Sequence, residues 1–381
     1  MKIIKSVSVA ALLLACSFSF FGCSSQQPPK KVLPYPQSWN DNSIFQAHYE
    51  KAALKLKTMS LEEKIGQLFL VRTPVNKAKE LLQKYQFGGY ILYKRDIDNN
   101  TKQSLQNKIS SWVSVSKIQP LIAVDEEGGT VVRISSNPNF RSSKFLSPRQ
   151  LYTQGGMEAI ASNTKEMVQL FESLGVNVNL APVADISTNP ADFIYQRSFG
   201  KEAPATAKFI ETVIQNTKGS RVSFAIKHFP GYGNNRDTHK ELVGDGRSLE
   251  EIKARDLVPF TAGAKQGAEA IMVSHNVVKA VDPQRPASLS KAINNLARQE
   301  CGFSGIMMTD NLDMRAVRNY TPKRACVEAF LAGNDVIMIS DYSTSVKEMQ
   351  EAIKTGVITE DALNQRVFRI LAWKYYKGII P

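Results

Sequence analysis

Eight short apolar runs, separated by longer amphipathic segments, constrain the fold of this 381-residue chain more than any other feature. Each run is nearly continuous in hydrophobicity, which is typical of strands buried on both faces of a parallel sheet. The runs are 65–72, 90–94, 121–125, 176–180, 223–229, 270–276, 305–310 and 336–339. Eight strand–helix units predict an α/β fold, a (β/α)8 TIM-type barrel in a single domain. A doubly wound open sheet is the alternative, because one misread run would change the strand count.

Helical patterns lie between these runs, and several of their ends carry recognisable signals. Ser248 followed by Glu251 is a capping-box pattern. Gly175 and Gly333 stand where a helix should stop before the next strand. We expect helices at 157–174, 203–218, 248–266, 291–300 and 322–332.

The first 23 residues resemble a secretion signal rather than part of a folded domain. A short basic stretch precedes an apolar segment, 7–21, that is too short for a membrane-spanning helix with flanks. Cys16 and Cys23 each follow a small residue, as in bacterial lipoprotein signals. We favour lipidation at Cys23, because a polar stretch follows it, with Cys16 as the alternative. We therefore expect an exported lipoprotein anchored to a membrane of the cell envelope, although a secretory signal without lipid stays open.

The rest of the chain reads as a linker over 24–40, rich in Pro, Ser and Gln, followed by one domain over 41–381. The formal net charge of +13 favours anionic partners in general. Because Lys and Arg are scattered, we interpret this charge as a solvated surface and expect no nucleic-acid partner. No Cys/His cluster has zinc spacing, and no nucleotide-binding glycine motif opens a helix, so we expect neither metal nor cofactor. We expect a monomer.

Charged and polar side chains follow five of the predicted strands, always at the same end. In a barrel, the catalytic residues lie on the loops after the C-terminal ends of the strands. Random surface charge would not collect in this way, so these residues are candidates for a functional site. They are Asp125, Glu126, Glu127, Arg133, Asp185, Arg197, Lys227, His228, His275, Asn276 and Asp310.

The loop after the fifth run carries Asp237 and His239, two positions apart. In an extended segment this spacing places both side chains on one face. A carboxylate beside an imidazole fixes its tautomer and stabilises its protonated form. His239 could then donate and accept a proton near neutral pH. From the residues alone, two ordinary polar loop positions are an equally good reading.

The segment 227–239, KHFPGYGNNRDTH, resembles the signature of single-domain β-N-acetylhexosaminidases of glycoside hydrolase family 3. Further matches follow in the family's order across roughly residues 60–340. Any one of them would be weak, but together and in order they are specific. They are Gly88-Gly89-Tyr90-Ile91-Leu92, Asp125-x-Glu127-Gly128-Gly129-x-x-x-Arg133, Ala181-Pro182-Val183-x-Asp185, Arg197-Ser198-Phe199-Gly200 and Met308-Thr309-Asp310-Asn311-Leu312.

The resemblance implies an exo-acting, retaining β-N-acetylglucosaminidase that works through a covalent glycosyl-enzyme on peptidoglycan fragments or related amino-sugar glycans. Asp310 matches the family's nucleophile, and His239, assisted by Asp237, matches its acid/base. This His–Asp pair departs from the usual pair of carboxylates. The resemblance also implies that the sugar is bound by Asp125, Arg133, Arg197, Lys227 and His228, and we expect His275 and Asp185 to support the pocket.

Two positions depart from the family's usual pattern: Tyr232 stands where a His is usual, and Asn311 where a second acid is common. A phosphorylase, which uses phosphate in place of water, is one alternative function, because a His acid/base leaves room for an anionic acceptor. A lipid-anchored binding barrel without activity is another. The presence of Asp310, Asp237 and His239 argues against it.

Overall fold

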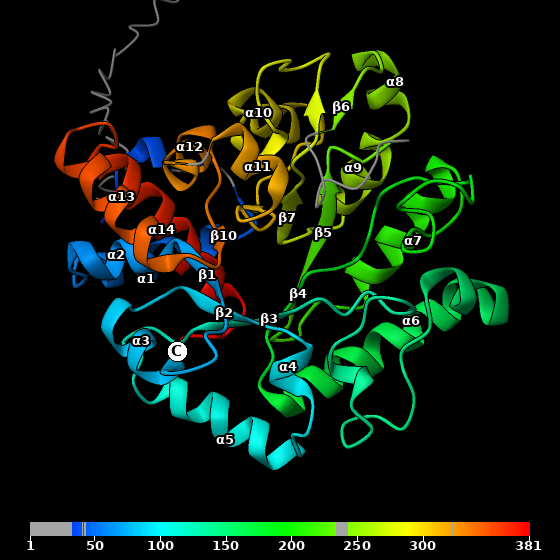
Figure 1. Cartoon of the computed structure of the whole chain (residues 1–381), viewed down its shortest axis with the longest axis horizontal. Helices are drawn as coiled ribbons and strands as arrows, with labels where there is room; N and C mark the ends of the chain where they lie inside the picture. Colours follow the sequence, from blue (N-terminus) through cyan, green and yellow to red (C-terminus); the bar gives the residue numbers. More distant parts are fainter. Residues whose placement is uncertain (1–32, 40, 42, 234–242, 322) are drawn as a thin grey trace, which may run out of the picture. The chain divides into compact units, whose positions relative to one another are not determined.

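The computed structural model describes residues 33–39, 41, 43–233, 243–321 and 323–381. Residues 34–381 form one compact unit. Its eight-stranded sheet is parallel throughout, in the order β10-β1-β2-β3-β4-β5-β7-β9. A parallel bridge between Met308 and Val336 joins the two ends of the sheet. The predicted (β/α)8 barrel is therefore confirmed, and in Figure 1 the helices surround the strands.

Each barrel strand lies within one of the eight predicted runs, except that β2 begins one residue before its run, at Gly89. The strands are β1 (Phe69–Arg72), β2 (Gly89–Leu92), β3 (Leu121–Val124), β4 (Val178–Asn179), β5 (Ser223–Phe229), β7 (Ala270–Val273), β9 (Ile306–Thr309) and β10 (Ile337–Ile339). A separate parallel pair joins β6 (Gly244–Asp245) and β8 (Val277–Val278). The first part of run 65–72 is helical instead, because a capping box of Ser60 and Glu63 starts helix α2 immediately before it.

The helices follow the predicted alternation. They are α1 (Tyr49–Leu56), α2 (Leu61–Gln67), α3 (Ala78–Tyr85), α4 (Lys94–Ile97), α5 (Lys102–Val113), α6 (Pro148–Leu174), α7 (Ala203–Gln215), α8 (Leu249–Ala254), α9 (Leu257–Lys265), α10 (Lys291–Glu300), α11 (Arg315–Tyr320), α12 (Ala325–Ala332), α13 (Tyr342–Lys354) and α14 (Glu360–Tyr376). The capping box at Ser248 is confirmed. Gly175 and Gly333 end α6 and α12 with positive φ angles of 80° and 112°, as a C-terminal glycine should.

The predicted helix 248–266 is two helices, α8 and α9, which part at Arg255 and Asp256. Pro259 supplies the physical reason. A proline has no N–H to donate to the carbonyl four residues earlier, and its ring clashes with that carbonyl, which here belongs to Arg255. Pro259 is instead accommodated in the first turn of α9, where no such bond is needed.

The described end of the predicted linker packs against the barrel domain. The rings of Tyr35 and Trp39 lie 5.2 and 5.3 Å from that of Phe368 in α14, centroid to centroid. Trp39 is buried, so the packed domain begins before residue 41. Cys16, Cys23 and the remainder of 24–40 up to residue 32 lie outside the described residues. Across the described ranges, no helix is long and apolar enough to cross a membrane.

Candidate active site

A pocket of about 300 Å³ opens at the C-terminal ends of the barrel strands. Its apolar lining includes Ile91, Leu180, Met272 and Met338, which come from the strands or their ends. The polar lining contains most of the residues predicted from the sequence. These are Asp125, Glu127, Arg133, Arg197, Lys227, His228 and Asp310, joined by Tyr93 and Asn311. Residues from the ends of several strands thus line one pocket, as predicted.

Lys227, near the end of β5, is held between two carboxylates. Its Nζ lies 2.8 Å from Asp125 Oδ1 and 2.7 Å from Glu127 Oε1. The lysine is only 2% exposed, and burial by itself would lower its pKa. The charges of Asp125 and Glu127 outweigh the burial and raise the pKa instead. Lys227 is therefore a fixed, fully charged donor in the pocket wall.

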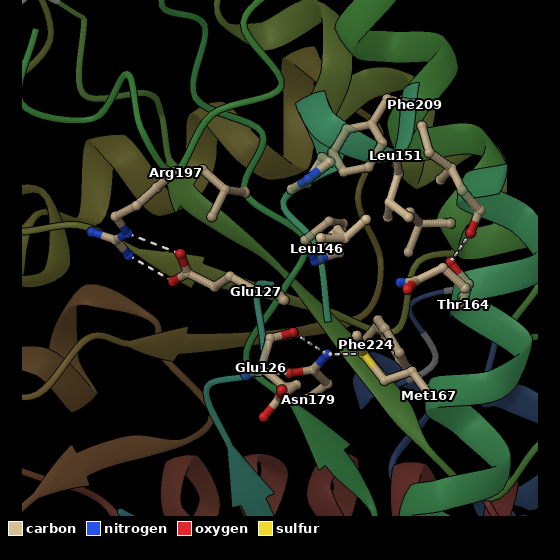
Figure 2. A pocket seen from close by; sticks show the side chains of 17 residues that line it. Glu126, Glu127, Leu146, Leu151, Thr164, Met167, Asn179, Arg197, Phe209 and Phe224 are labelled. Atoms are coloured by element: carbon tan, nitrogen blue, oxygen red, sulfur yellow. Dashed lines mark hydrogen bonds and ion pairs between the residues drawn. The ribbon is translucent and has the colours of Figure 1, made fainter. Parts of the chain in front are cut away.

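Glu127 joins this lysine to Arg197. The Arg197 guanidinium donates from Nε at 2.9 Å and from Nη2 at 2.7 Å to the two Glu127 oxygens, the bidentate pair drawn in Figure 2. Burial alone would raise the pKa of Glu127, but Lys227 and Arg197 hold it well below its usual range. The same pairing raises the pKa of Arg197. All three groups are therefore ionised at neutral pH.

His228 is fixed in one orientation by a second carboxylate. Backbone hydrogen bonds join Lys227 to Pro182 and Ala184, and they bring Asp185 alongside β5. Asp185 Oδ2 lies 2.6 Å from His228 Nδ1, so Nδ1 carries a proton. The other ring nitrogen, Nε2, lies 3.2 Å from Arg197 Nη2. Because the guanidinium can only donate, the geometry suits an Nε2 that accepts from Arg197 and an Nδ1 that donates to Asp185.

Glu126 of the β3–α6 loop and Asn179 of β4 shape the wall that carries Arg133. The buried Glu126 carboxylate accepts the backbone N–H groups of Arg133 and Ile134, both at 2.7 Å. Asn179, at the end of β4, binds the backbone of Glu126 from the other side, through its amide oxygen at 3.1 Å and nitrogen at 3.0 Å. Figure 2 shows this amide between Glu126 and Met167. The carboxylate also accepts the hydroxyl of Ser135. Because these partners all belong to the β3–α6 loop, Glu126 fixes that loop and its role is structural.

Asp310 follows β9 directly and is half-buried in the pocket lining. Its backbone N–H donates to the Val273 carbonyl at 2.9 Å, and its Oδ1 accepts the N–H of Asn311 at 2.7 Å. His275 lies behind this turn, where its Nε2 is 3.0 Å from the Asn311 carbonyl oxygen and its Nδ1 is 2.7 Å from Ser288 Oγ. His275 is fully buried and is absent from the pocket lining. It therefore contacts the backbone of the Asp310–Asn311 turn from behind, and its role in supporting the pocket stays a prediction.

Tyr93, which lies within the second predicted run and directly follows the observed strand β2, was given no role from the sequence. Its side chain lines the pocket. Burial raises the pKa of Tyr93, and the nearby charges of Asp125 and Asp310 add to the rise. The hydroxyl therefore stays protonated and is a donor close to both carboxylates. The available signal was a residue with a polar group near the C-terminal end of an apolar run.

The structure describes Tyr232 and Asn311, the two positions that depart from the family's pattern. Tyr232 is buried, packs edge-on against His228 with centroids 4.9 Å apart, and donates its backbone N–H to Asp185 at 2.7 Å. Asn311 lines the pocket and donates to Ser340 Oγ at 3.2 Å. Asp237 and His239 lie outside the described residues. Among the residues that are described, no cluster of three or more His, Cys, Asp or Glu could hold a metal ion.

Comparison with known proteins places the chain among carbohydrate-cleaving enzymes. Residues 60–373 match the Glycosyl hydrolase family 3 N terminal domain. Beta-hexosaminidase A of Pseudoalteromonas piscicida is 30% identical over 324 residues, which is 77% of this chain and 54% of that protein. Beta-hexosaminidase of Xanthomonas axonopodis pv. citri (strain 306) is 30% identical over 296 residues, 75% of this chain and 85% of that protein.

A solved structure shares the fold over most of the chain. It is a glycoside hydrolase family 3 beta-N-acetylglucosaminidase from Paenibacillus sp. str. FPU-7, with a TM-score of 0.79 and 26% sequence identity. The match covers 84% of this chain and 63% of that one. The chain thus spans only about half to two thirds of the length of two of these three relatives.

Proposed function

The chain belongs to glycosyl hydrolase family 3 and is a glycosidase, and from that premise we propose that it removes terminal β-linked N-acetylglucosamine from amino-sugar glycans. The observation that carries the proposal is the pocket at the C-terminal ends of the strands, where Asp310 shares one cavity with Asp125, Lys227 and His228. Active sites of barrel enzymes lie at this end. Two relatives similar over three quarters of the chain bear the name beta-hexosaminidase.

The size and lining of the pocket support action at a chain end. A cavity of about 300 Å³ lies at the small end of ligand pockets. It suits a single sugar ring with its N-acetyl group rather than several rings. Lys227 and Arg133 are donors and Asp125 is an acceptor for vicinal hydroxyls, and charge-assisted hydrogen bonds are the stronger kind. Because Lys227 is already held by two carboxylates, it needs little reordering when a sugar binds.

Asp310 is the proposed nucleophile of a retaining mechanism. One of its oxygens attacks the anomeric carbon, the bond from that carbon to the leaving oxygen breaks, and an ester-linked glycosyl-enzyme forms. His239, oriented by Asp237, gives its proton to the leaving oxygen. It then takes a proton from a water molecule whose oxygen displaces Asp310. The roles of His239 and Asp237 rest on the resemblance of segment 227–239, because both lie outside the described residues.

Release of 4-nitrophenol from its β-N-acetylglucosaminide and its β-glucoside, with and without phosphate, tests the proposal. We expect faster turnover of the N-acetylglucosaminide, no dependence on phosphate, and loss of turnover in Asp310→Ala. Proton NMR of the first product should show the β anomer. Lack of turnover of both substrates would overturn the proposal. A sugar phosphate as product would identify the alternative phosphorylase, and an α anomer would refute retention.

We further propose that the chain is an exported lipoprotein, anchored through Cys23, that acts as a monomer on peptidoglycan fragments in the cell envelope. The support is the sequence of the first residues, which lie outside the described part of the chain. Membrane fractionation with fatty-acid labelling tests the anchor. Cys23→Ala should release the protein and remove the label, whereas Cys16→Ala should not. The reverse result would move the anchor to Cys16.

A further inference from the structure

The segment that joins β5 to β6 carries Asp237 and His239, the proposed acid/base pair. The structure describes the two ends of this segment, which run up to residue 233 and begin again at residue 243. We call residues 230–233 the outgoing stem and residues 243–247, which include β6, the returning stem. Contacts that hold the two stems limit where the residues between them can lie.

The outgoing stem is fixed by its backbone. The Gly231 N–H donates to the His228 carbonyl oxygen at 2.7 Å, and the Tyr232 N–H donates to Asp185 Oδ1 at 2.7 Å. Gly231 has a φ of 120°, and a Cβ atom there would come within 2.7 Å of Asp256 Oδ1. The Asp256 carboxylate therefore lies directly against the backbone of Gly231, and only a glycine permits this approach.

The returning stem is fixed by strand pairing. Its strand β6 runs parallel to β8, which follows β7 at the rim of the barrel. The Val277 N–H donates to the Val243 carbonyl oxygen at 2.8 Å, and the Lys279 N–H donates to the Asp245 carbonyl oxygen at 3.0 Å. The backbone of the returning stem is therefore tied to a neighbouring element on both sides of β6.

Arg247 joins the two stems. Its Nη2 lies 2.7 Å from Asp245 Oδ2 and its Nε lies 3.0 Å from Asp245 Oδ1, whereas its Nη1 lies 2.5 Å from Asp256 Oδ2. A Cβ atom on Gly233 would come within 2.5 Å of Arg247 Nη2, so the guanidinium lies against the outgoing stem. A planar guanidinium can hold several acceptors at once in this way, which a lysine ammonium cannot reproduce.

The charges around Arg247 compensate one another in a mostly buried place. The side chains of Asp245 and Asp256 are 3% and 1% exposed. Burial alone would lower the pKa of Arg247, but its hydrogen bonds to these two carboxylates raise it. Asp256 Oδ1 has no hydrogen-bond partner among the described residues, and Arg255 lies farther from Asp256, at 4.0 Å. The place of the Asp256 carboxylate under Gly231 therefore depends on Arg247.

We propose that Arg247 is a positioning residue for the acid/base step, because with Asp245 and Asp256 it fixes the separation of the two stems that bound the segment with His239. This inference rests on the proposed function and adds a residue to it. Arg247 is not among the residues that line the pocket, so it acts through the chain and not on the sugar. Fixed ends reduce the number of conformations open to the residues between them. Misplacement of a catalytic group by about 1 Å can cost about 100-fold in rate.

The dependence of kcat/KM on the leaving group tests this role. Phenyl β-N-acetylglucosaminide has a poor leaving group that needs a proton from the acid, whereas the 2,4-dinitrophenyl compound needs almost none. Arg247→Lys keeps the charge and loses the planar fork. We expect it to lower kcat/KM by about 10- to 100-fold for the phenyl substrate and by less than about 3-fold for the dinitrophenyl substrate. Gly233→Ala, which displaces the guanidinium from the other side, should give the same pattern.

Arg298→Lys is the matched control, because Arg298 also pairs with a buried carboxylate, that of Asp335 at 3.3 Å, at the opposite ends of the strands. It should affect both substrates equally or not at all, and urea denaturation establishes that each variant is folded. His239→Ala supplies the reference pattern for loss of the acid. If Arg247→Lys lowers kcat/KM equally for both substrates, or for neither, the inference is refuted. The proposed function fails separately, through a wild type that cleaves neither substrate or a His239→Ala variant without leaving-group dependence.

Discussion

Replacement of Glu127 by Gln removes a buried charge that two cations share. The carboxylate lies 2.7 Å from Lys227 Nζ and 2.7 Å from Arg197 Nη2, and the side chains of Glu127 and Lys227 are each 2% exposed. Loss of one partner of a buried ion pair costs about 3–5 kcal/mol, because the remaining charge is left without compensation. Asp125 still pairs with Lys227 at 2.8 Å, so only Arg197 loses its partner. We therefore expect Glu127→Gln to lower the free energy of unfolding by about 3 kcal/mol.

The pH dependence of this loss has a definite sign. In the folded protein the pKa of Glu127 lies well below its usual value of 4.5, because Lys227 and Arg197 outweigh burial. A carboxyl with a depressed folded pKa stabilises the protein above its unfolded pKa and loses this contribution as pH falls through the folded value. The difference between wild type and Glu127→Gln should thus be constant above about pH 5.5 and decrease below about pH 4.5.

Urea denaturation of the two proteins at pH 7 and pH 4 measures both effects. Glu166→Gln is the matched control, because Glu166 also pairs with an arginine, Arg141, but is 51% exposed. An exposed pair contributes about 0–1 kcal/mol, so the control should change stability little. A loss below 1 kcal/mol for Glu127→Gln at pH 7, or a loss that does not decrease in acid, would refute the reasoning.

Three further outcomes follow from single side chains. Asp310→Asn should reduce kcat on the 4-nitrophenyl substrate by about 1,000-fold or more while equilibrium binding of the product sugar changes little, because an amide cannot form the glycosyl ester; unchanged kcat would contradict this. Arg133→Met should lower kcat/KM by about 10- to 100-fold without a change in unfolding free energy, since the guanidinium donates only to its neighbour Val132 among the described residues. Lys374 is buried, and burial lowers its pKa to about 7, so wild-type stability should rise between about pH 7 and 10.5 as the unfolded lysine loses its proton; calorimetry of Lys374→Met should show no such rise.

The barrel could be predicted from the sequence because each of its strands is marked by a short local run of apolar residues. Each strand is buried on both faces, so its run of apolar residues is visible without knowledge of neighbours. Helix ends were also readable where one or two residues set them, as at Ser248 and Gly175. The boundary errors arose where two local signals competed. Pro259 divides a continuous amphipathic pattern, and Ser60 extends a helix into an apolar run.

The candidate site was only partly predictable, because strand ends fix position but not orientation. Asp125, Lys227 and Asp310 come from three strands whose C-terminal ends meet, so their convergence follows from the fold. The roles of Glu126 and Glu127 do not. These adjacent carboxylates have different partners. Glu126 accepts backbone N–H groups, whereas Glu127 binds Lys227 and Arg197. Their orientation depends on partners 7 to 100 residues away, which a local pattern does not encode.

Some charged residues of the pocket stabilise the protein, and others are placed to bind the sugar. Glu127, Arg197 and Lys227 satisfy one another within the protein, so their charges are largely compensated before any ligand arrives. Asp310 and Arg133 are half-buried in the lining of the same pocket. A sugar exchanges its hydration for bonds to groups that are already oriented, so little ordering entropy is lost on binding. Substitutions of Glu127, Arg197 or Lys227 should therefore reduce stability and activity together. Substitutions of Arg133 or Asp310 should reduce activity with little change in stability.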